Sequence, residues 1–309
     1  MKQLLLIINP RSGKEQIRRN LIDLVDIFVK AGYEVTIHTT QKPKDAMEVL
    51  CQRGENRDLI VVSGGDGTLN EAISGLMMME EKNRPLLGYI PAGSTNDYAS
   101  SIGISRNMEQ AAHTAVEGES FAADVGRFAG ERYFVYVAAF GAFTEVSYRT
   151  SQETKNLLGH QAYMLEAVRR VTNLKSYRMR FEWEGQILEE EFILGMVTNA
   201  LSIGGFKGLV DGAVALDDGE FEVLLIRTPK TPKDIASIAS YLLLKEEKND
   251  CVYQFRTKEL KVTAEEETDW TLDGEYGGKH KEIVIENLHR AVLIRRERSA
   301  FVTKAGKSE

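Results

Sequence analysis

A glycine-rich segment near residue 65 is the feature that most constrains the fold of this chain. It reads Gly-Gly-Asp-Gly-Thr-Leu-Asn-Glu over residues 64–71 and follows the apolar run 59–62, which predicts a buried strand. Apolar residues then recur with helical spacing from Leu69 to Leu76. The sequence therefore predicts a tight turn that joins a strand directly to the N-terminus of a helix.

This turn has the composition of an anion-binding loop. Its glycines allow the backbone to approach a bulky ligand, and the helix N-terminus offers unpaired N–H groups to a phosphate. Asp66 lies among the glycines. Its charge would repel a phosphate unless a cation lay between them, which implies Mg²⁺ together with a nucleotide. Thr68 and Glu71 also match a capping box, so these two residues have a purely structural alternative.

The first third of the chain alternates between strand and helix patterns. Helix patterns separate four predicted strands, at 4–8, 34–38, 59–62 and 86–90. This alternation is typical of a parallel sheet flanked by helices, with ligands at the carboxyl ends of the strands. We therefore expect a nucleotide-binding α/β domain over residues 1–123, with residues 295–309 as a candidate completion of it.

Strand patterns dominate from Asp124 onward. Aromatic and β-branched residues mark several short strands, and Glu184-Gly185 between two of them indicates a hairpin. Two helical stretches, 158–171 and 235–243, interrupt the strands. We expect residues 124–294 to form a mainly antiparallel β-sandwich domain that carries the substrate site.

Charge, cysteine content and hydrophobic runs argue against several classes of protein. The net charge of −7 gives no reason to expect nucleic acid as a partner. Cys51 and Cys251 match no metal or redox spacing, which is typical of a reducing cytosolic compartment. The longest nearly apolar stretch, 133–143, is well below the roughly 18 residues that suggest a spanning helix. We therefore expect a soluble, cytoplasmic protein.

Polar residues also follow the other predicted strands of the first domain. They are Asn9, Ser12, Gly13 and Lys14 after the first strand, Thr40 after the second, and Ser94 with Thr95 after the fourth. The first group lacks the early glycine of a Walker A loop, so an ordinary connection remains its alternative. A threonine at a strand end often merely starts a turn.

In their order along the chain, these segments resemble the diacylglycerol kinase catalytic-domain family, which includes soluble bacterial lipid kinases, sphingosine kinases and ceramide kinases. NAD kinases and phosphofructokinases carry a similar Gly-Gly-Asp-Gly loop, so that loop alone does not define the substrate. The resemblance implies that ATP is the phosphate donor. It implies nucleotide contacts from Asn9, Ser12, Gly13, Lys14, Thr40, Gly64, Gly65, Asp66, Gly67, Thr68, Leu69, Asn70, Ser94 and Thr95. Ser94 stands where the family usually has threonine, which leaves open whether Ser94 or Thr95 makes the contact.

The same resemblance implies two magnesium sites. Asp97 and Asp124 resemble acids that join Asp66 in a network of water and Mg²⁺, although either could instead cap a helix or form a turn. Residues 215–221 resemble a segment that holds a structural Mg²⁺ through the Asp218 carboxylate, with help from the carbonyl groups of Ala215 and Glu220. A plain Asp-Asp-Gly turn is the alternative there.

An Asp-Gly-Glu sequence at 273–275 is the second strong signal. Taken alone it would be a hairpin turn, since Asp-Gly is the commonest hairpin dipeptide. Phosphoryl transfer to an alcohol needs a carboxylate that takes the hydroxyl proton. The resemblance implies that Glu275 is this proton acceptor, and Asp273 is the second candidate for the catalytic base.

A stretch from Lys155 to Tyr163 resembles the bacterial diacylglycerol kinases more than the sphingosine kinases. Basic residues follow it closely: Arg169, Arg170, Lys175, Arg178 and Arg180. Such a run could dock on an anionic membrane, although it is more often just a solvated face.

The sequence as a whole predicts an ATP- and Mg²⁺-dependent lipid kinase that phosphorylates the free hydroxyl of diacylglycerol, or of a similar lipid, to give phosphatidic acid. It would meet its lipid substrate at the inner face of the membrane, and a homodimer is left open. The alternatives are an NAD-kinase-like or sphingoid small-molecule kinase and a non-catalytic regulator that binds lipid or nucleotide. A regulator would more readily have lost Asp66 or Glu275.

Overall fold

The chain divides into two compact units, each described here by itself. This computed structural model describes residues 1–13, 16–142, 174–200, 202–203, 206–207, 215–244 and 249–298. Unit 1 comprises Met1–Val125 and His289–Glu309, and unit 2 comprises Gly126–Leu288. Unit 1 is therefore built from both ends of the chain. No helix among the described residues is long and apolar enough to cross a membrane.

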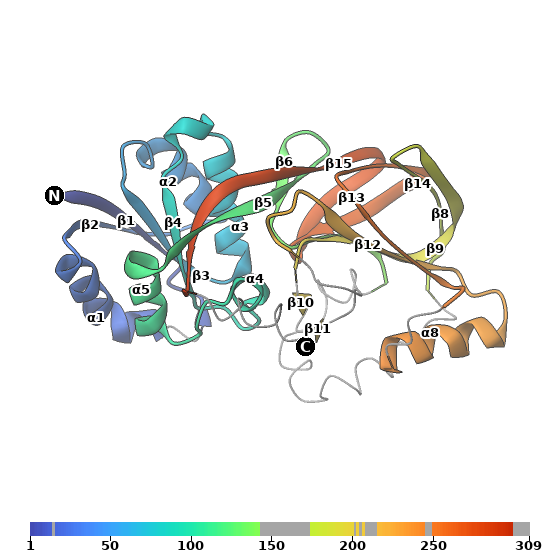
Figure 1. Ribbon diagram of the computed structural model, residues 1–309, viewed down its shortest axis with the longest axis horizontal. Coiled ribbons are helices and arrows are strands. Elements are labelled where there is room, and N and C mark those ends of the chain that lie inside the picture. Colours follow the sequence, from blue (N-terminus) through green and yellow to red (C-terminus); the bar gives the residue numbers. More distant parts are fainter. Residues whose placement is uncertain are drawn as a thin grey trace, which may run out of the picture. The chain divides into compact units, whose positions relative to one another are not determined.

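Unit 1 contains a sheet of parallel strands, coloured blue to cyan in Figure 1. Its strands lie in the order β2 (Tyr33–Thr39), β1 (Lys2–Ile8), β3 (Leu59–Gly64) and β4 (Leu86–Pro91), and each pairs with its neighbour in parallel. The parallel sheet expected for the first third of the chain is thus present in these four strands. Strands β1 and β3 are almost wholly buried, as their unbroken apolar runs predict.

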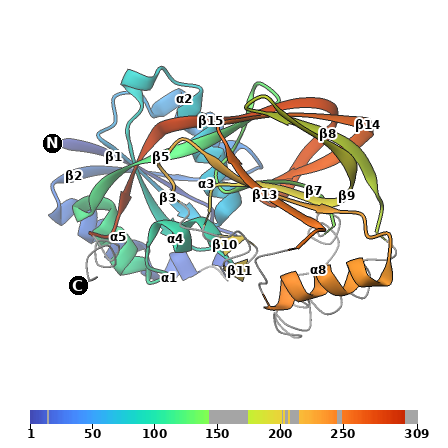
Figure 2. The same ribbon diagram turned by 45° about the vertical axis from the view of Figure 1, so that its right-hand side comes forward.

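Helices cover both faces of this sheet. They are α1 (Gln16–Lys30), α2 (Asp45–Arg53), α3 (Asp66–Met77), the 3₁₀ turn η2 (Glu81–Asn83), α4 (Asp97–Ile102) and α5 (Met108–Glu117). Helix α1 packs with α5 and α2 packs with α3, and these two pairs lie on opposite faces of the strands in Figures 1 and 2. Connections between parallel strands are right-handed, so the face that a connecting helix covers depends on the direction in which the chain moves along the sheet. The chain moves in one direction from β1 to β2 and in the other direction from β2 to β3 and β4, so α1 covers one face and α2 and α3 cover the other.

The capping box proposed for the glycine-rich segment is not formed. Helix α3 begins at Asp66, with Gly65 at its N-cap position and no side-chain cap. The Glu71 carboxylate instead accepts hydrogen bonds from the backbone N–H groups of Lys44 (2.7 Å) and Ala46 (3.3 Å), at the start of α2. Glu71 therefore ties the N-terminus of a neighbouring helix to α3.

Unit 2 is built mainly from strands, and the strand pairs within it whose register is known are antiparallel. The strands are β6 (Arg132–Phe134), β7 (Val137–Gly141), β8 (Tyr177–Trp183), β9 (Gln186–Thr198), β10 (Ser202–Ile203), β11 (Phe206–Lys207), β12 (Phe221–Arg227), β13 (Val252–Thr257) and β14 (Glu259–Leu272). Strands β5 (Glu119–Phe128) and β15 (Glu275–Arg296) each begin in one unit and end in the other. The sheet containing the parallel strands is therefore mixed, since most of its remaining pairs are antiparallel.

The core of unit 2 is rich in aromatic side chains. Strand β8 pairs with both β9 and β14, and β7 also pairs with these two strands. Phe140, Phe181 and Trp270 lie in the buried cluster that these strands enclose. The expected hairpin at Glu184-Gly185 joins β8 to β9, and the expected helix at 235–243 lies within α8 (Pro232–Leu244). The other expected helix, 158–171, lies outside the described residues.

Candidate functional site

Three of the predicted ligand loops meet at the carboxyl ends of β1, β3 and β4. Parallel strands bring their carboxyl ends to one edge of a sheet, so loops far apart in sequence become neighbours there. The Asn9 side chain after β1 donates a hydrogen bond from Nδ2 to Thr68 Oγ1 in α3, at 3.0 Å. Its backbone N–H binds the carbonyl of Ser63 at 2.8 Å. The loop after β1 is thereby fixed against the glycine-rich loop.

Glycine is required where these loops touch. A Cβ atom on Gly13, which has a φ of +59°, would lie 2.0 Å from the Ala92 carbonyl oxygen. One on Gly93 would lie 2.7 Å from the Cα atom of Gly65. The backbones of all three loops therefore pack directly on one another, with no side chain between them. Such packing leaves backbone N–H groups close to the space a ligand would occupy.

Asp66 accepts hydrogen bonds from three donors of the loop after β4. They are Thr95 Oγ1 at 3.3 Å and the N–H groups of Asp97 and Tyr98 at 3.2 and 3.4 Å. Burial and then the nearby charge of Asp97 raise the pKa of Asp66, although the N–H donors oppose the rise. A half-buried carboxylate held in place by neutral donors suits a hard cation with oxygen ligands, so these residues fit the expected Mg²⁺.

Asn96 organises the loop that carries Thr95, and the sequence analysis did not single it out. Its Oδ1 accepts from the N–H of Gly93 at 2.9 Å, and its Nδ2 donates to the Gly93 carbonyl at 2.8 Å. Asn96 is buried and has a φ of 50°, a left-handed conformation that asparagine tolerates better than most residues. Thr95 contacts Asp66, and Ser94 is exposed beside it.

The other predicted nucleotide residues occupy the same edge or the helix behind it. Gly64 ends β3, and Gly67, Thr68, Leu69 and Asn70 lie in the first turns of α3. Leu69 is fully buried, so its side chain belongs to the core. Ser12 donates its N–H to the Asn9 carbonyl, Thr40 donates its N–H to the Ile8 carbonyl, and Lys14 lies outside the described residues.

Asp124 has partners of its own within unit 1. Its carboxylate is completely buried, lies 3.1 Å from His289 Nδ1 and accepts the backbone N–H of Arg290 at 2.7 Å. Among the residues that the structure describes, no three His, Cys, Asp or Glu side chains form a group that could hold a metal. Asp66, Asp97 and Asp124 are thus not gathered into one three-acid cluster. Asp124 anchors the segment that returns to unit 1.

In unit 2, the Asp-Gly-Glu sequence forms the turn between β14 and β15. Asp273 and Gly274 have φ values of 51° and 85°, as a two-residue hairpin turn requires. The buried Asp273 carboxylate accepts hydrogen bonds from three backbone N–H groups, those of Val135, Tyr136 and Val137, at 2.7 to 3.0 Å. Glu275 is exposed at the start of β15. Asp273 is therefore placed to hold the turn, whereas the side chain of Glu275 is open to solvent.

Arg132 holds the other side of this turn, and no local sequence signal pointed to it. Its guanidinium donates to the carbonyl groups of Tyr276 (2.8 Å) and Gly277 (2.5 Å). The register of β14 with β15 shifts next to Gly277, between Trp270 and Thr271. Bulges of this kind often redirect a side chain near a functional site. Here the irregular backbone directly follows Glu275.

The predicted structural magnesium site contains a paired arginine. The Asp218 carboxylate accepts the N–H of Glu220 at 3.1 Å and also accepts a hydrogen bond from Arg256. Ala215, the third predicted ligand, is half-buried. Nearby Glu222 is almost completely buried, and this burial raises its pKa to about 7 although Arg256 lowers it.

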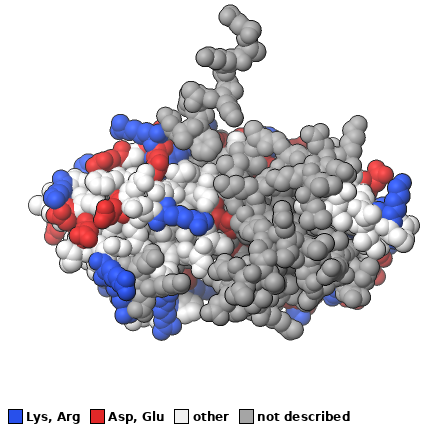
Figure 3. All heavy atoms as spheres, turned by 90° about the horizontal axis from the view of Figure 1, so that it is seen from below, with Lys and Arg blue, Asp and Glu red and all other residues white. Residues whose placement is uncertain are grey.

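The described part of the basic run is largely neutralised by acidic neighbours. Arg178 pairs with Glu189 at 3.0 Å, and Arg180 pairs with Glu182 at 3.2 Å. Arg169 and Arg170, like the 155–163 segment, lie outside the described residues. On the face shown in Figure 3, the described blue and red side chains are interspersed.

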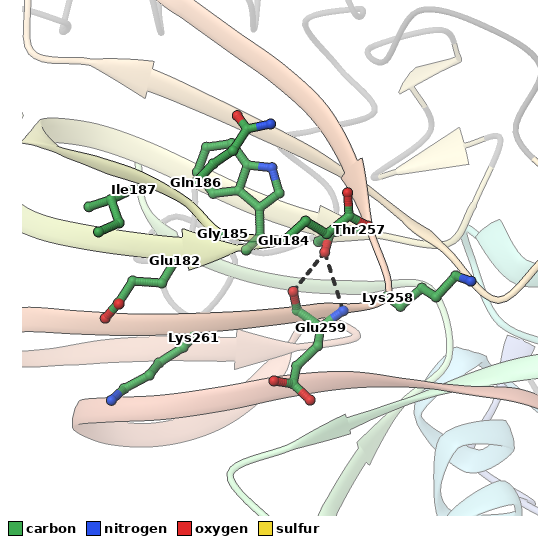
Figure 4. Close-up of a pocket in the computed structure, with 10 residues that line it drawn as sticks. Glu182, Glu184, Gly185, Gln186, Ile187, Thr257, Lys258, Glu259 and Lys261 are labelled. Carbon is green, nitrogen blue, oxygen red and sulfur yellow. Dashed lines mark hydrogen bonds between the residues drawn. The ribbon is translucent and has the colours of Figure 1, made fainter.

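A cavity of about 470 Å³ opens beside the β8–β9 hairpin. Figure 4 shows its walls, formed by residues 182–187 and by Thr257, Lys258, Glu259 and Lys261. Thr257 Oγ1 donates a hydrogen bond to the Glu259 carbonyl at 2.7 Å, which links the end of β13 to the start of β14. The cavity lies at the opposite end of β14 from the Asp273 turn and contains none of the predicted site residues.

Each of the two units matches a known domain family. The model of the diacylglycerol kinase catalytic domain matches residues 3–128, and the model of the YegS C-terminal NAD kinase beta sandwich-like domain matches residues 137–293. A diacylglycerol kinase from Bacillus subtilis (strain 168) is 34% identical over 281 residues, covering 90% of this chain and 91% of that protein. One from Staphylococcus aureus (strain MRSA252) is also 34% identical, covering 90% of this chain and 87% of that protein.

Solved structures show the same architecture. A diacylglycerol kinase from Bacillus anthracis str. Sterne superposes with a TM-score of 0.76 at 24% identity, covering 96% of this chain and 97% of that one. A second structure from the same organism has a TM-score of 0.81 at 27% identity and covers 96% of this chain and 95% of its own. The likeness therefore extends over both units of the chain.

Proposed function

We propose a function from one premise: the chain belongs to the diacylglycerol kinase family. It is accordingly a kinase, and we assign it the transfer of the γ-phosphate of ATP to the free hydroxyl of diacylglycerol or a similar lipid. The product would be phosphatidic acid. The observation that carries this proposal is the meeting of three glycine-containing loops around Asp66 at one edge of the parallel sheet.

The residues at this edge would bind the nucleotide. Backbone N–H groups of the glycine-rich loop and the open N-terminus of α3 would hold the phosphates. Asn9 and Thr95 would fix the two flanking loops through their hydrogen bonds to Thr68 and Asp66. This division of roles suits phosphoryl transfer, which depends mostly on positioning and on the neutralisation of charge.

Asp66, with Asp97 next to it, would hold Mg²⁺. When bound, this ion neutralises the charge on the transferred phosphoryl group and its neighbours. The hydrogen bonds that Asp66 accepts from the N–H groups of Asp97 and Tyr98 support this assignment. We assign Asp124 to the anchoring of His289 and Arg290, because these residues occupy its Oδ1 atom.

Glu275 would take the proton from the lipid hydroxyl as the phosphate is transferred. It is the exposed acid of the β14–β15 turn, whereas Asp273 is buried and committed to three N–H groups. A carboxylate that already accepts three hydrogen bonds is a poor acceptor for a further proton. The lipid would be reached at the inner membrane face, since diacylglycerol resides in the bilayer.

The decisive experiment offers the purified protein labelled ATP with vesicles that contain diacylglycerol, sphingosine or ceramide, and with NAD in solution. Labelled phosphatidic acid as the main product supports the proposal. Labelled NADP would favour the NAD-kinase-like alternative, to which the beta sandwich-like domain of unit 2 also corresponds. Nucleotide binding without any labelled product would favour the non-catalytic regulator.

A further inference from the structure

An acidic corner at the start of β12 contains its own cation. We define this corner as Asp218, Glu220 and Glu222. The guanidinium of Arg256 contacts all three acids: it donates to Asp218 from Nη2, its Nη1 lies 3.3 Å from Glu220 Oε2, and its Nε lies 3.4 Å from Glu222 Oε1. One side chain therefore balances three carboxylates.

Strand register explains why Arg256 reaches this position. Arg256 on β13 lies directly opposite Glu222 on β12, and Glu222 lies opposite Thr198 on β9. Residues paired across antiparallel strands share one face of the sheet. Glu220 precedes Glu222 by two residues and belongs to the same face. The contacts with Arg256 thus follow from the pairing of β12 with β13.

The corner also contains a side chain that depends on this cation. Glu222 is 2% exposed, and among the residues that the structure describes neither of its carboxylate oxygens has a hydrogen-bond partner. A buried acid without hydrogen bonds is costly unless a charge lies close to it. The guanidinium at 3.4 Å supplies such a charge. If Arg256 were lost, the three acids would lose the cation that contacts all of them.

The atoms that the family resemblance assigns to a structural Mg²⁺ do not fit a second cation here. Asp218 would be the metal's only carboxylate ligand, but one of its oxygens accepts the Glu220 N–H and the other accepts Arg256. Mg²⁺ requires near-octahedral oxygen ligands and would have to share the Asp218 carboxylate with the guanidinium of Arg256. It would then lie against a fixed positive charge.

We infer that Arg256 is the resident cation of this corner and that unit 2 is stable without a divalent metal at Asp218. This inference concerns the stability of unit 2 and stands independently of the proposed phosphoryl transfer. It replaces the expected structural metal site with an ion-pair network between β12, β13 and the turn before β12.

The test measures the thermal stability of the full-length, nucleotide-free protein. The wild type and the variants Asp218→Asn, Arg256→Gln and Arg256→Lys are stripped with EDTA, and their Tm is recorded with and without added Mg²⁺. Mn²⁺ binding, followed by electron paramagnetic resonance, counts the bound ions. Arg178→Gln is the matched control, since Arg178 is also a partly exposed arginine paired across strands with a glutamate, Glu189.

We expect the wild type and Asp218→Asn to bind the same number of Mn²⁺ ions and to respond equally to Mg²⁺. Arg256→Gln should melt lower in EDTA by roughly 5 °C, and Arg256→Lys should lose less because it retains a positive charge. Arg178→Gln should change little. Added Mg²⁺ should stabilise Arg256→Gln more than the wild type, because an unbalanced acidic corner is then open to it.

The inference is overturned if the wild type binds one more Mn²⁺ ion than Asp218→Asn does. It is also overturned if EDTA lowers the Tm of the wild type but not that of Asp218→Asn, or if Arg256→Gln is as stable as the wild type in EDTA. Should Arg256→Gln fail to fold, the comparison of the wild type with Asp218→Asn decides by itself.

Discussion

The Asp66 carboxylate lies half-buried beside Asp97, and both features raise its pKa. Because the pKa is raised in the folded state, protonated Asp66 stabilises the fold at acidic pH. That contribution is lost as the pH rises through the raised value. The residue proposed to bind a cation thus lowers the stability of the metal-free protein at neutral pH. Such a cost is common at functional sites.

We predict that Asp66→Asn abolishes most of the activity while the protein still folds. The kcat/KM should fall at least 10²- to 10³-fold, as for the loss of a group that organises transition-state charge. Because asparagine does not titrate, the difference in Tm between the variant and the wild type should shift in favour of the variant as the pH rises. Turnover assays and a pH series of melting curves measure the two effects. An active variant would remove Asp66 from the proposed site.

The two acids of the β14–β15 turn should respond differently to substitution. Glu275→Gln should leave the Tm unchanged and lower kcat by about 10²- to 10⁴-fold, the contribution typical of a general base. ATP affinity should not change. Kinetics with diacylglycerol and separate measurements of ATP binding test this. Undiminished turnover by Glu275→Gln would show that another group takes the proton.

Asp273→Asn should act mainly on stability. The amide has one oxygen, and its NH₂ group would face N–H donors that now bind a carboxylate. We expect unfolding to become easier by about 1 to 3 kcal/mol, as when a buried polar group loses its partner. Denaturant titration measures this. A stable but inactive Asp273→Asn would reverse the roles assigned to the two acids.

At the level of elements, the segment 132–137 forms hydrogen bonds with both sides of the β14–β15 turn. Its backbone N–H groups bind Asp273, and Arg132 binds the carbonyl groups of Tyr276 and Gly277. A base at a turn performs well only if its backbone is fixed, because small misplacements reduce rates strongly. We therefore expect Arg132 to act as a positioning residue for the proposed base Glu275.

We predict that Arg132→Gln lowers kcat by roughly 10- to 100-fold while the KM for ATP stays unchanged. Arg132→Lys should recover part of the loss. The control is Arg127→Gln, which breaks the paired hydrogen bonds with Glu286 at 2.7 and 2.8 Å but contacts no residue of the turn. An equal fall in kcat for both variants would mean that Arg132 acts only through general stability.

At the level of the whole molecule, β15, the last described strand, completes unit 1. Ile294 on β15 pairs in parallel with Leu87 on β4, and its side chain is fully buried. Arg84 also donates to the Ala291 carbonyl at 2.8 Å. The sheet of unit 1 can therefore be completed only after unit 2 has been synthesised.

Ile294→Ala should destabilise unit 1 by about 2 to 5 kcal/mol, the usual cost of removing a large aliphatic side chain from a core. Leu293→Ala is the matched control, because its side chain is 48% exposed and its loss should cost far less. Melting followed with and without ATP would show whether the nucleotide-binding unit is the part affected. Similar losses for both variants would contradict the buried role of Ile294.

The sequence was sufficient to predict the features that depend on neighbours in the chain. Strand periodicity indicated β1, β3 and β4, and the glycine pattern located the turn before α3, because both are set by local backbone preferences. The Asp-Gly turn and the β8–β9 hairpin were predicted for the same reason. The order of these segments was also enough to indicate the kinase family.

The tertiary structure alone decided the roles of residues whose partners are distant in sequence. Glu71 resembled a local cap but binds the start of α2, and Asp124 meets His289 across 165 residues. Asp273 is committed to N–H groups more than 130 residues away, which separates it from Glu275. Arg256 reaches Asp218 only because β12 pairs with β13. A local pattern shows that an acid is present, but only the folded chain determines which donor or cation faces it.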